Sequence, residues 1–272
     1  MQKYSATPKE LMASIWRNRG LIKISVKREI QARYRGSVFG ILWSVFNPAF
    51  MLAIYTFVFS VVFKARWGGG SDSKTEFALL LFAGLITFNL FGECVARAPT
   101  LIMSNTNYVK KVIFPLEILP IVTIGSALFH ALISIIVWLF TYLLFYGFPQ
   151  ATSIFLPLVF IPLILYTMGA TWCLTSLGVY LRDMSQFVGM LLTMLMFLSP
   201  VFYAAASLPI EYRKYLMLNP LSPIIEQARE VLYWGRAPDI MSLAASFIGG
   251  AIVAYLGFVC FQKTRKGFAD VL

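Results

Sequence analysis

Long uncharged, apolar runs alternate along the chain with short segments that carry nearly all of the charged side chains. Asp, Glu, Lys and Arg are absent from residues 36–63, 77–92, 118–181, 184–210 and 240–262. A helix that crosses the roughly 30 Å hydrocarbon core of a bilayer needs about 20 mainly apolar residues. The pattern therefore predicts an integral membrane protein built from several spanning helices.

Two of these runs need interpretation before the spans can be counted. The longest run is divided by the turn signal Gly147–Gln150, which places two helices where one would be too long. The shortest run reaches spanning length if Glu93 and Arg97 pair across one helical turn. We therefore predict an all-α membrane protein with six transmembrane helices, near 38–63, 77–98, 118–146, 154–181, 184–207 and 240–262. Together they form a transmembrane domain of residues 36–262.

Composition agrees with a membrane protein, because 59% of the residues are hydrophobic and only 13% are charged. A soluble domain has about 25% charged residues. The net charge of +11 would suggest nucleic acid as a partner of a soluble protein. An even number of spans puts both ends on one side, and cytoplasmic ends place 16 basic residues inside against 7 outside. The positive-inside rule then favours an N-in/C-in topology and no nucleic-acid partner.

Three segments lie outside the predicted spans. Residues 1–35 are expected to form a cytoplasmic segment of amphipathic interface helices, which begins at a capping motif at Thr7–Glu10 and breaks near Asn18. Residues 263–272 are expected to be a cytoplasmic tail. The outer segment 211–239 has apolar residues at helical spacing but is too charged to span, so a re-entrant or interfacial helix pair is expected before the last span.

Motifs for catalysis or nucleotide binding are not evident. The segment Gly68–Thr75 resembles a phosphate loop, but Ser73 stands where the last glycine is needed, and a flexible outer loop is the better interpretation. Three cysteines, Cys94, Cys173 and Cys260, are too widely spaced for a metal site or a disulfide framework. We expect no catalytic residue, no metal and no cofactor on this chain.

The single histidine, His130, lies in the middle of the third predicted span. An ionisable group at such a place can belong to a proton relay. His130 has no acidic residue within a helical turn on its own span, so a neutral, hydrogen-bonded packing role is favoured over a relay.

Several short stretches follow one another along the chain in a characteristic order. They are Arg28–Ser37, Leu42–Trp43, Asn47–Pro48, Tyr108–Pro115, Tyr180–Asp183, Leu198–Tyr203, Asn219–Pro220 and Arg229. In this order the chain resembles, over nearly its whole length, the membrane (permease) subunit of ABC-2-type exporters. The resemblance is to the branch that exports O-antigen and capsular polysaccharide.

This resemblance implies a complex of two membrane subunits, a homodimer, with two cytoplasmic ABC ATPase subunits that bind ATP and Mg. The cargo would be a lipid-linked glycan that crosses the inner (cytoplasmic) membrane of a bacterium through a channel in contact with membrane lipids. Two alternatives remain, namely an ABC-2 exporter of small molecules or lipids and a membrane-embedded glycosyltransferase. The second would need an acidic or metal-binding cluster, whereas the acidic residues here are scattered at the ends of loops.

Candidate contacts to the ATPase lie in the two cytoplasmic loops. Tyr108, Lys110 and Lys111 combine a ring with two charges, which suits a protein interface. The alternative for the lysines is binding of lipid head groups. Arg182 and Asp183 form the short turn between spans four and five, where they could transmit motion or serve only as an anchor and a helix cap.

The resemblance further implies that the first and fifth spans line the passage. Aromatic rings can stack on sugar faces without fixed hydrogen bonds, so they could form a low-specificity track. The candidates are Trp43, Phe46, Tyr55, Phe197, Phe202 and Tyr203, each with lipid-facing packing as the alternative. Ser199 and Pro200 are candidates for an outer gate, because proline there is expected to bend the fifth span.

Overall fold

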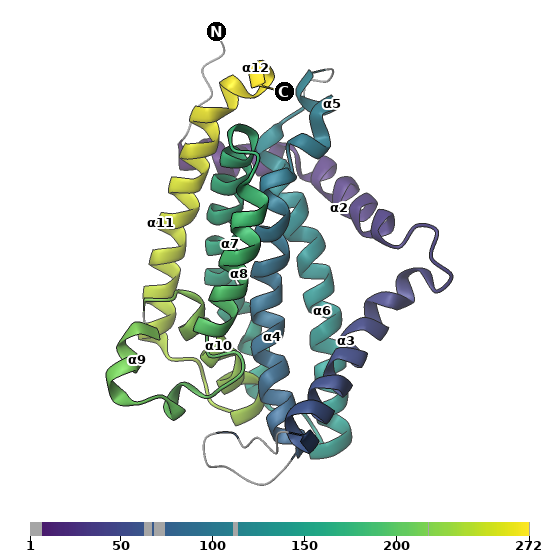
Figure 1. Cartoon of the computed structure of the whole chain (residues 1–272), viewed down its shortest axis with the longest axis vertical. Helices are drawn as coiled ribbons and strands as arrows, with labels where there is room; N and C mark the ends of the chain where they lie inside the picture. The colour runs from purple at the N-terminus through teal and green to yellow at the C-terminus, as the bar shows by residue number, and fades with distance from the viewer. Residues whose placement is uncertain (1–6, 63–66, 68–73, 111–113, 217, 272) are drawn as a thin grey trace.

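The computed structural model describes residues 7–62, 67, 74–110, 114–216 and 218–271. Every regular element in these ranges is a helix, so an all-helical fold is confirmed for the described chain. The long helices run roughly side by side along the long axis of the molecule, and both termini lie at the same end (Figure 1).

Within the described residues, five helical segments are long and apolar enough to cross a membrane: Gly40–Phe59, Thr75–Thr100, Leu116–Tyr146, Ala151–Tyr180 and Ile240–Gly267. They correspond to the helices α3 (Trp43–Tyr55), α4 (Lys74–Arg97), α6 (Leu119–Tyr146), α7 (Leu156–Tyr180) and α11 (Ile240–Thr264). The π-helical turn Thr56–Val62 extends α3. Five of the six predicted spans therefore have a helix of sufficient length.

The predicted fifth span is shorter in the structure than the sequence suggested. Helix α8 (Met184–Leu198) has 15 residues and ends directly before Ser199–Pro200, instead of bending there and continuing to residue 207. At 1.5 Å per residue it is about 22 Å long, less than the roughly 30 Å hydrocarbon core. The count of six spans and the division at residues 36 and 262 thus stay predictions.

Helix α4 is the centre of the bundle, although its charge-free run is the shortest. In the most apolar stretch of the α4 segment, 83% of the residues are buried, against 11% in that of the first segment, which contains α3. Neighbours of α4 include α6, α7, α8 and α10, and the Trp138 indole of α6 donates to the Leu79 carbonyl at 2.8 Å. The outlying position of α3 leaves most of its surface available to lipid or to another chain.

Helices α7 and α11 pack more closely than any other pair of long helices. A Cβ added at Gly169 would lie 2.3 Å from the Val253 carbonyl oxygen, and one added at Gly257 would lie 2.2 Å from the Gly169 carbonyl oxygen. Only glycine permits this approach of the two backbones. The turn before α7 was predicted correctly, since α6 ends at Tyr146 and Gly147 has a φ of 85°.

The N-terminal segment forms the two expected helices, α1 (Pro8–Arg17) and α2 (Arg19–Arg33), on either side of Asn18. Thr7 caps α1, as its Oγ1 accepts from the Glu10 amide at 3.3 Å. Helix α2 packs on α6, where Val26 approaches Gly125 so closely that an added Cβ would lie 2.6 Å from Cγ2 of Val26. The location of α1 and α2 at the membrane surface stays a prediction.

Helices α9 (Ile210–Leu216) and α10 (Leu221–Arg229) form the predicted helix pair before the last long helix. They lie toward the end of the molecule opposite the termini (Figure 1). An apolar stripe runs along α10 and the π-helical turn Glu230–Trp234. The residues of this stripe are buried in the main core: Ile224, Ile225, Ala228, Val231 and Leu232. Helices α5 (Thr106–Lys110) and α12 (Phe268–Val271) lie near the termini (Figure 1).

Candidate functional site

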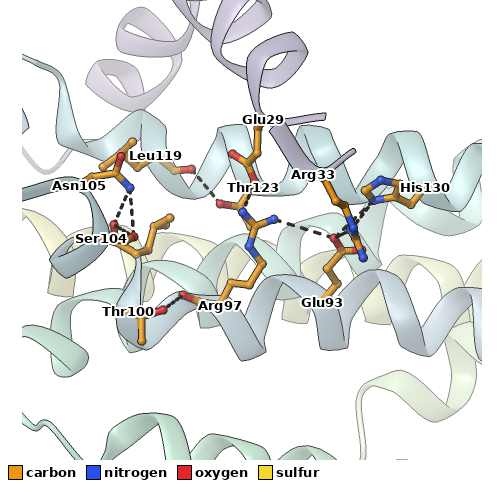
Figure 2. A network of polar contacts seen from close by, with 11 residues as sticks. Glu29, Arg33, Glu93, Arg97, Thr100, Ser104, Asn105, Leu119, Thr123 and His130 are labelled. Carbon is orange, nitrogen blue, oxygen red and sulfur yellow. Dashed lines mark hydrogen bonds and ion pairs between the residues drawn. The ribbon is translucent and has the colours of Figure 1, made fainter. Parts of the chain in front are cut away.

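Four charged side chains connect α2 to the bundle near the terminal end of the molecule. Glu29 and Arg33 project from α2, and Glu93 and Arg97 project from α4 (Figure 2). Arg33 pairs with Glu93, Arg97 Nη2 lies 2.5 Å from Glu29 Oε1, and Arg97 Nη1 lies 3.9 Å from Glu93 Oε1. The two positive and two negative charges balance, and the predicted pairing of Glu93 with Arg97 is confirmed. We call these four residues the α2–α4 network.

His130 of α6 joins this network (Figure 2). Its Nδ1 lies 3.0 Å from Arg33 Nη1 and 3.4 Å from Glu93 Oε1. A guanidinium can only donate and a carboxylate can only accept, so Nδ1 lies between a donor, Arg33, and an acceptor, Glu93. The acidic neighbour comes from another helix, which a search within one helical turn could not find.

A cavity of about 490 Å³ lies beside the network, among α3, α4, α6 and the end of α2. Its lining combines charged groups with amides, hydroxyls and rings: Arg33, Tyr34, Asn47, Tyr55, Asn89, Glu93, His130 and Ser134. Burial raises the pKa of the Tyr34 phenol, so this group stays a neutral hydroxyl. Such a lining can hydrogen-bond a polar ligand inside an otherwise apolar bundle.

A second polar cluster fixes α1 at the same end. The buried Glu117 accepts from Ser14 Oγ at 2.9 Å and from Arg265 Nη1 at 2.5 Å. The backbone carbonyl of Glu117 accepts from the Trp172 indole at 3.0 Å. These contacts join α1 and α7 to the segment just after α11, so that the two ends of the chain are held together.

Arg229, at the end of α10, is the most completely buried charged side chain among the described residues, with 1% exposed. Its Nε donates to the Leu80 carbonyl at 2.9 Å, and its Nη1 and Nη2 donate to the carbonyls of Pro200 and Val201 at 2.6 and 2.8 Å. Nη1 also pairs with Glu226 at 3.0 Å. The guanidinium therefore joins α4, the chain after α8 and α10.

Two further groups surround this arginine. The ring of Trp67 lies 4.3 Å from the guanidinium carbon, a cation–π contact. Gly84 on α4 provides space, since an added Cβ would lie 2.6 Å from Arg229 Nη2. From the sequence, Arg229 stood out only in the resemblance and in the count of outer basic residues. The signal that could have found it is an arginine at helical spacing beside an apolar stripe, with an acidic partner three residues earlier.

The predicted gate pair, Ser199 and Pro200, lies next to Arg229. Ser199 is fully buried, its Oγ donates to the Leu195 carbonyl at 2.6 Å, and it accepts from Asn219 Nδ2 at 2.8 Å. The Pro200 carbonyl is bound by Arg229. Helix α8 thus ends at a turn formed by this pair. Its polar groups bind Asn219, just before α10, and Arg229, at the end of α10.

Of the predicted ATPase contacts, Tyr108 makes the best-defined contacts within the chain. Arg28 of α2 donates to the Tyr108 hydroxyl at 2.7 Å, and the Phe114 ring stacks on Tyr108 at 4.3 Å. Lys110 ends α5, and Lys111 lies outside the described residues. The predicted loop is therefore linked to α2, which itself reaches the α2–α4 network.

Arg182 and Asp183 are exposed in the turn between α7 and α8. This turn lies toward the same end as the termini and α5 (Figure 1). The Asp183 backbone carbonyl accepts from the amides of Gln186 and Phe187, but its side chain makes no capping hydrogen bond. A capping role of the Asp183 carboxylate is therefore not seen.

The predicted aromatic residues fall into two groups. On α3, Trp43 and Phe46 belong to a ladder of edge-to-face and tilted rings with Phe39 and Phe50, at centroid distances of 5.7 to 6.5 Å. Trp43 and Phe46 are each 42% exposed. This ladder faces outward from the single chain.

The second group gathers around Phe59, in the π-helical extension of α3. Phe59 lies 6.3 Å from Tyr55 and 6.0 Å from Phe202, and Phe197 lies 5.6 Å from Phe202. The Tyr203 hydroxyl donates to the Phe197 carbonyl at 3.3 Å. The structure therefore brings four of the six candidates together where α3 meets the end of α8, and it leaves the other two apart.

Among the described residues, no three His, Cys, Asp or Glu side chains are grouped so that they could hold a metal ion. The phosphate-loop-like segment lies mostly outside the described residues. The described residues thus provide a polar cavity, charged clusters at both ends of the bundle and a helix, α3, with little packing of its own.

Comparison with known proteins gives consistent matches. The sequence pattern of a family described as ABC-2 type transporter matches residues 20–233. The chain is 27% identical to the O-antigen export system permease protein RfbA of Myxococcus xanthus, over 96% of this chain and 98% of that protein. It is 26% identical to the protein of the same name from Klebsiella pneumoniae, over 93% and 95%. It is 24% identical to the polysialic acid transport protein KpsM of Escherichia coli, over 88% and 91%.

Proposed function

The chain belongs to the family of ABC-2 type transporter membrane proteins, and from this premise we propose that it is the permease subunit of an ATP-driven exporter of a lipid-linked polysaccharide. The observation that carries the proposal is the near-complete alignment with relatives named for O-antigen export and polysialic acid transport. A hydroxyl-rich polymer cannot cross about 30 Å of hydrocarbon without a lined passage.

In this proposal two copies of the chain assemble with two cytoplasmic ATPase subunits in a bacterial inner membrane. The 11% burial of the first apolar segment supports a second copy, because a helix with so little packing leaves room for a partner. Six spans with both ends in the cytoplasm fit the charge distribution. In that topology α8 and the turn after it together reach the outer side.

Transmission of ATPase motion would begin at the terminal end of the molecule. Tyr108 and Arg28 link the predicted docking loop to α2. Helix α2 then contacts α4 through Glu29 and Arg33, and α6 through Val26. The exposed Arg182–Asp183 turn offers a second route, directly into α8. Both routes end on helices that border the 490 Å³ cavity, since α4, α6 and Leu192 of α8 line it.

The cargo would pass between α3 and α8, along the aromatic rings of both copies. The exposed ladder around Trp43 and the cluster around Phe59 support two successive stretches of this track. The outer gate would lie at the Ser199–Pro200 turn, which would form its fixed side, because Arg229 holds the Pro200 carbonyl and the Phe197–Phe202 pair lies next to it.

The function is tested by deleting the gene and measuring polysaccharide on the cell surface. The proposal expects the polymer to be lost from the surface and to accumulate inside, and an ATPase subunit to co-purify with the chain. Normal surface polysaccharide together with failed secretion of a small molecule or lipid would instead favour the alternative cargo.

Topology is tested separately by single-cysteine labelling in intact cells. Glu211→Cys, on the exposed face of α9, should react with an impermeant reagent, whereas Lys9→Cys and Lys266→Cys should not. Labelling of Lys266→Cys from outside would contradict the N-in/C-in arrangement. Ser71, another predicted outer site, lies outside the described residues.

A further inference from the structure

A second cavity, of about 750 Å³, lies among α7, α9, α10 and α11. Helices α9 and α10, which line it, lie toward the end opposite the termini and apart from α3 (Figure 1). The walls include small and aliphatic side chains such as Pro200, Leu216, Pro223 and Ala245. Polar side chains also line it, so the cavity combines a mainly apolar wall with a few polar groups.

The hydroxyl of Ser222, in the cavity wall, favours a ligand that can accept a hydrogen bond. The Ser222 side chain is buried, lines the cavity, and its Oγ has no hydrogen-bond partner among the described residues. Buried hydroxyls almost always find a partner. Ser242 and Ser246 of α11 line the same cavity. An occupant that is mainly apolar and also carries oxygen acceptors would fit both the walls and the serine.

Helix α9, which borders this cavity, has the composition of a segment at a membrane surface. Tyr212, Tyr215 and Ile210 are exposed, and aromatic residues of this type favour the interface of a bilayer. Arg213 lines the cavity and is held there by hydrogen bonds from its guanidinium to the carbonyls of Leu208 and Ala206, at 2.9 and 2.5 Å.

A positive charge lies at the cavity wall. Arg213 lines the cavity and is exposed, and Lys214, which follows it in the chain, is exposed as well. A phosphate group is the anion that a phospholipid would present to this arginine. Glu226 also lines the cavity, but its carboxylate is paired with Arg229.

From this combination we propose that the cavity binds one phospholipid of the outer leaflet. An acyl chain lies between α9 and α11, an ester carbonyl accepts from Ser222, and the phosphate is bound at Arg213. The assignment to the outer leaflet rests on the proposed topology, whereas the binding itself does not depend on the cargo. Because Pro200 and Glu226 are wall residues, the lipid supports the turn that Arg229 holds.

The test uses the exporter purified in detergent with its ATPase, phosphatidylglycerol as the probe, and native mass spectrometry to count bound lipids. Ala245→Trp places a ring in the cavity and should remove one phosphatidylglycerol per membrane chain. The matched control is Ile248→Trp on the same helix, because Ile248 is 59% exposed and does not line the cavity. The control should keep the wild-type lipid count. Equal counts in an intact Ala245→Trp complex would overturn the proposal.

A second variant changes the chemistry without filling space. Ser222→Ala removes only the hydroxyl and should weaken phosphatidylglycerol binding to delipidated complex about fivefold, the effect of one hydrogen bond. Phosphatidylglycerol should also raise the thermal stability of the wild-type complex and not that of Ala245→Trp. Unchanged phosphatidylglycerol affinity in Ser222→Ala would refute the proposed lipid site while leaving the export function untouched.

Discussion

The α2–α4 network and the cluster around Arg229, which lie at opposite ends of the bundle, are built in different ways. At the terminal end, the α2–α4 network pairs side chain with side chain, and its members are 21% to 46% exposed. At the opposite end, Arg229 is 1% exposed and donates to three backbone carbonyls besides Glu226. Paired side chains can exchange partners when helices move, whereas a carbonyl moves only with its backbone. The first cluster therefore suits a connection that opens and closes, and the second suits a fixed support.

The largest effect is expected at the fixed support. Arg229→Ala leaves the carboxylate of Glu226 and three carbonyls without their donor, which should destabilise the protein by about 3–5 kcal/mol. We expect the amount of protein in the membrane and the thermal stability of the purified complex to fall strongly. Arg229→Lys should rescue little, because one ammonium group cannot reach all of these carbonyls.

The control for this prediction is Arg236→Ala in the same outer segment. Arg236 is 71% exposed and pairs with Glu230 at 3.4 Å. A pair of this kind contributes about 0–1 kcal/mol. Equal stability of Arg229→Ala and Arg236→Ala would show that the outer cluster is not a support.

The next effect is expected in the α2–α4 network and concerns export more than stability. Glu29→Ala and Arg97→Ala should each lower ATP-driven export several-fold at a normal protein level, since either one breaks the link between α2 and α4. The double variant should be no worse than the more damaging single variant. That non-additivity, a coupling energy of about 0.5–3 kcal/mol, is measured by a double-mutant cycle.

Helix α1 provides the comparison for this cycle. Glu10 and Arg17 form an exposed pair within that helix, with 3.2 Å between the charged atoms. Alanine at either position should leave export unchanged. Strictly additive effects of Glu29→Ala and Arg97→Ala would mean that the two residues act separately.

A more selective effect is expected at the turn between α7 and α8. Because the Asp183 carboxylate is exposed and makes no capping bond, Asp183→Ala should not alter stability. If this turn transmits motion into α8, the variant should hydrolyse ATP at a normal rate while exporting less polymer. Ser185→Ala, two residues further along and also exposed, is the control. Normal export in Asp183→Ala removes this residue from the mechanism.

The smallest single effects are expected from the aromatic rings. Trp43→Ala and Phe46→Ala remove half-exposed side chains and should lower surface polysaccharide modestly without lowering the protein level. Tyr55→Ala and Phe202→Ala disturb the packed cluster around Phe59, so protein level and polysaccharide should fall together. Phe140→Ala, an exposed ring on α6, is the control. Normal surface polymer in all four variants would exclude the aromatic track.

The helices of this fold could be predicted largely from apolar periodicity and punctuation. Thr7, Asn18 and Gly147 mark element ends through local backbone chemistry, which a sequence displays directly. The end of α8 was harder to predict, because the residues after Pro200 are as apolar as a span. Their turn depends on Arg229, which binds the carbonyls of residues 200 and 201 from 28 or 29 positions away.

The charged clusters could not be predicted because their partners are distant in sequence. Glu93 and Arg97 were visible as a pair, but Glu29 lies 64 or more positions away and His130 comes from a third helix. Arg229 was counted with the basic residues of an outer loop, although it is inside the core. Periodicity reports which face of a helix is buried, and it does not report which helix covers that face.

The contacts of Arg229 also set an order for synthesis in the cell. The carbonyls of Leu80, Pro200 and Val201 emerge from the ribosome well before the arginine that binds them. Until residue 229 has been made, the centre of the bundle lacks its donor, and the earlier helices can meet only loosely. Completion of the core is therefore a late event in the biogenesis of this subunit. A chain that stalls before α10 would present these open carbonyls to the quality-control proteases of the membrane.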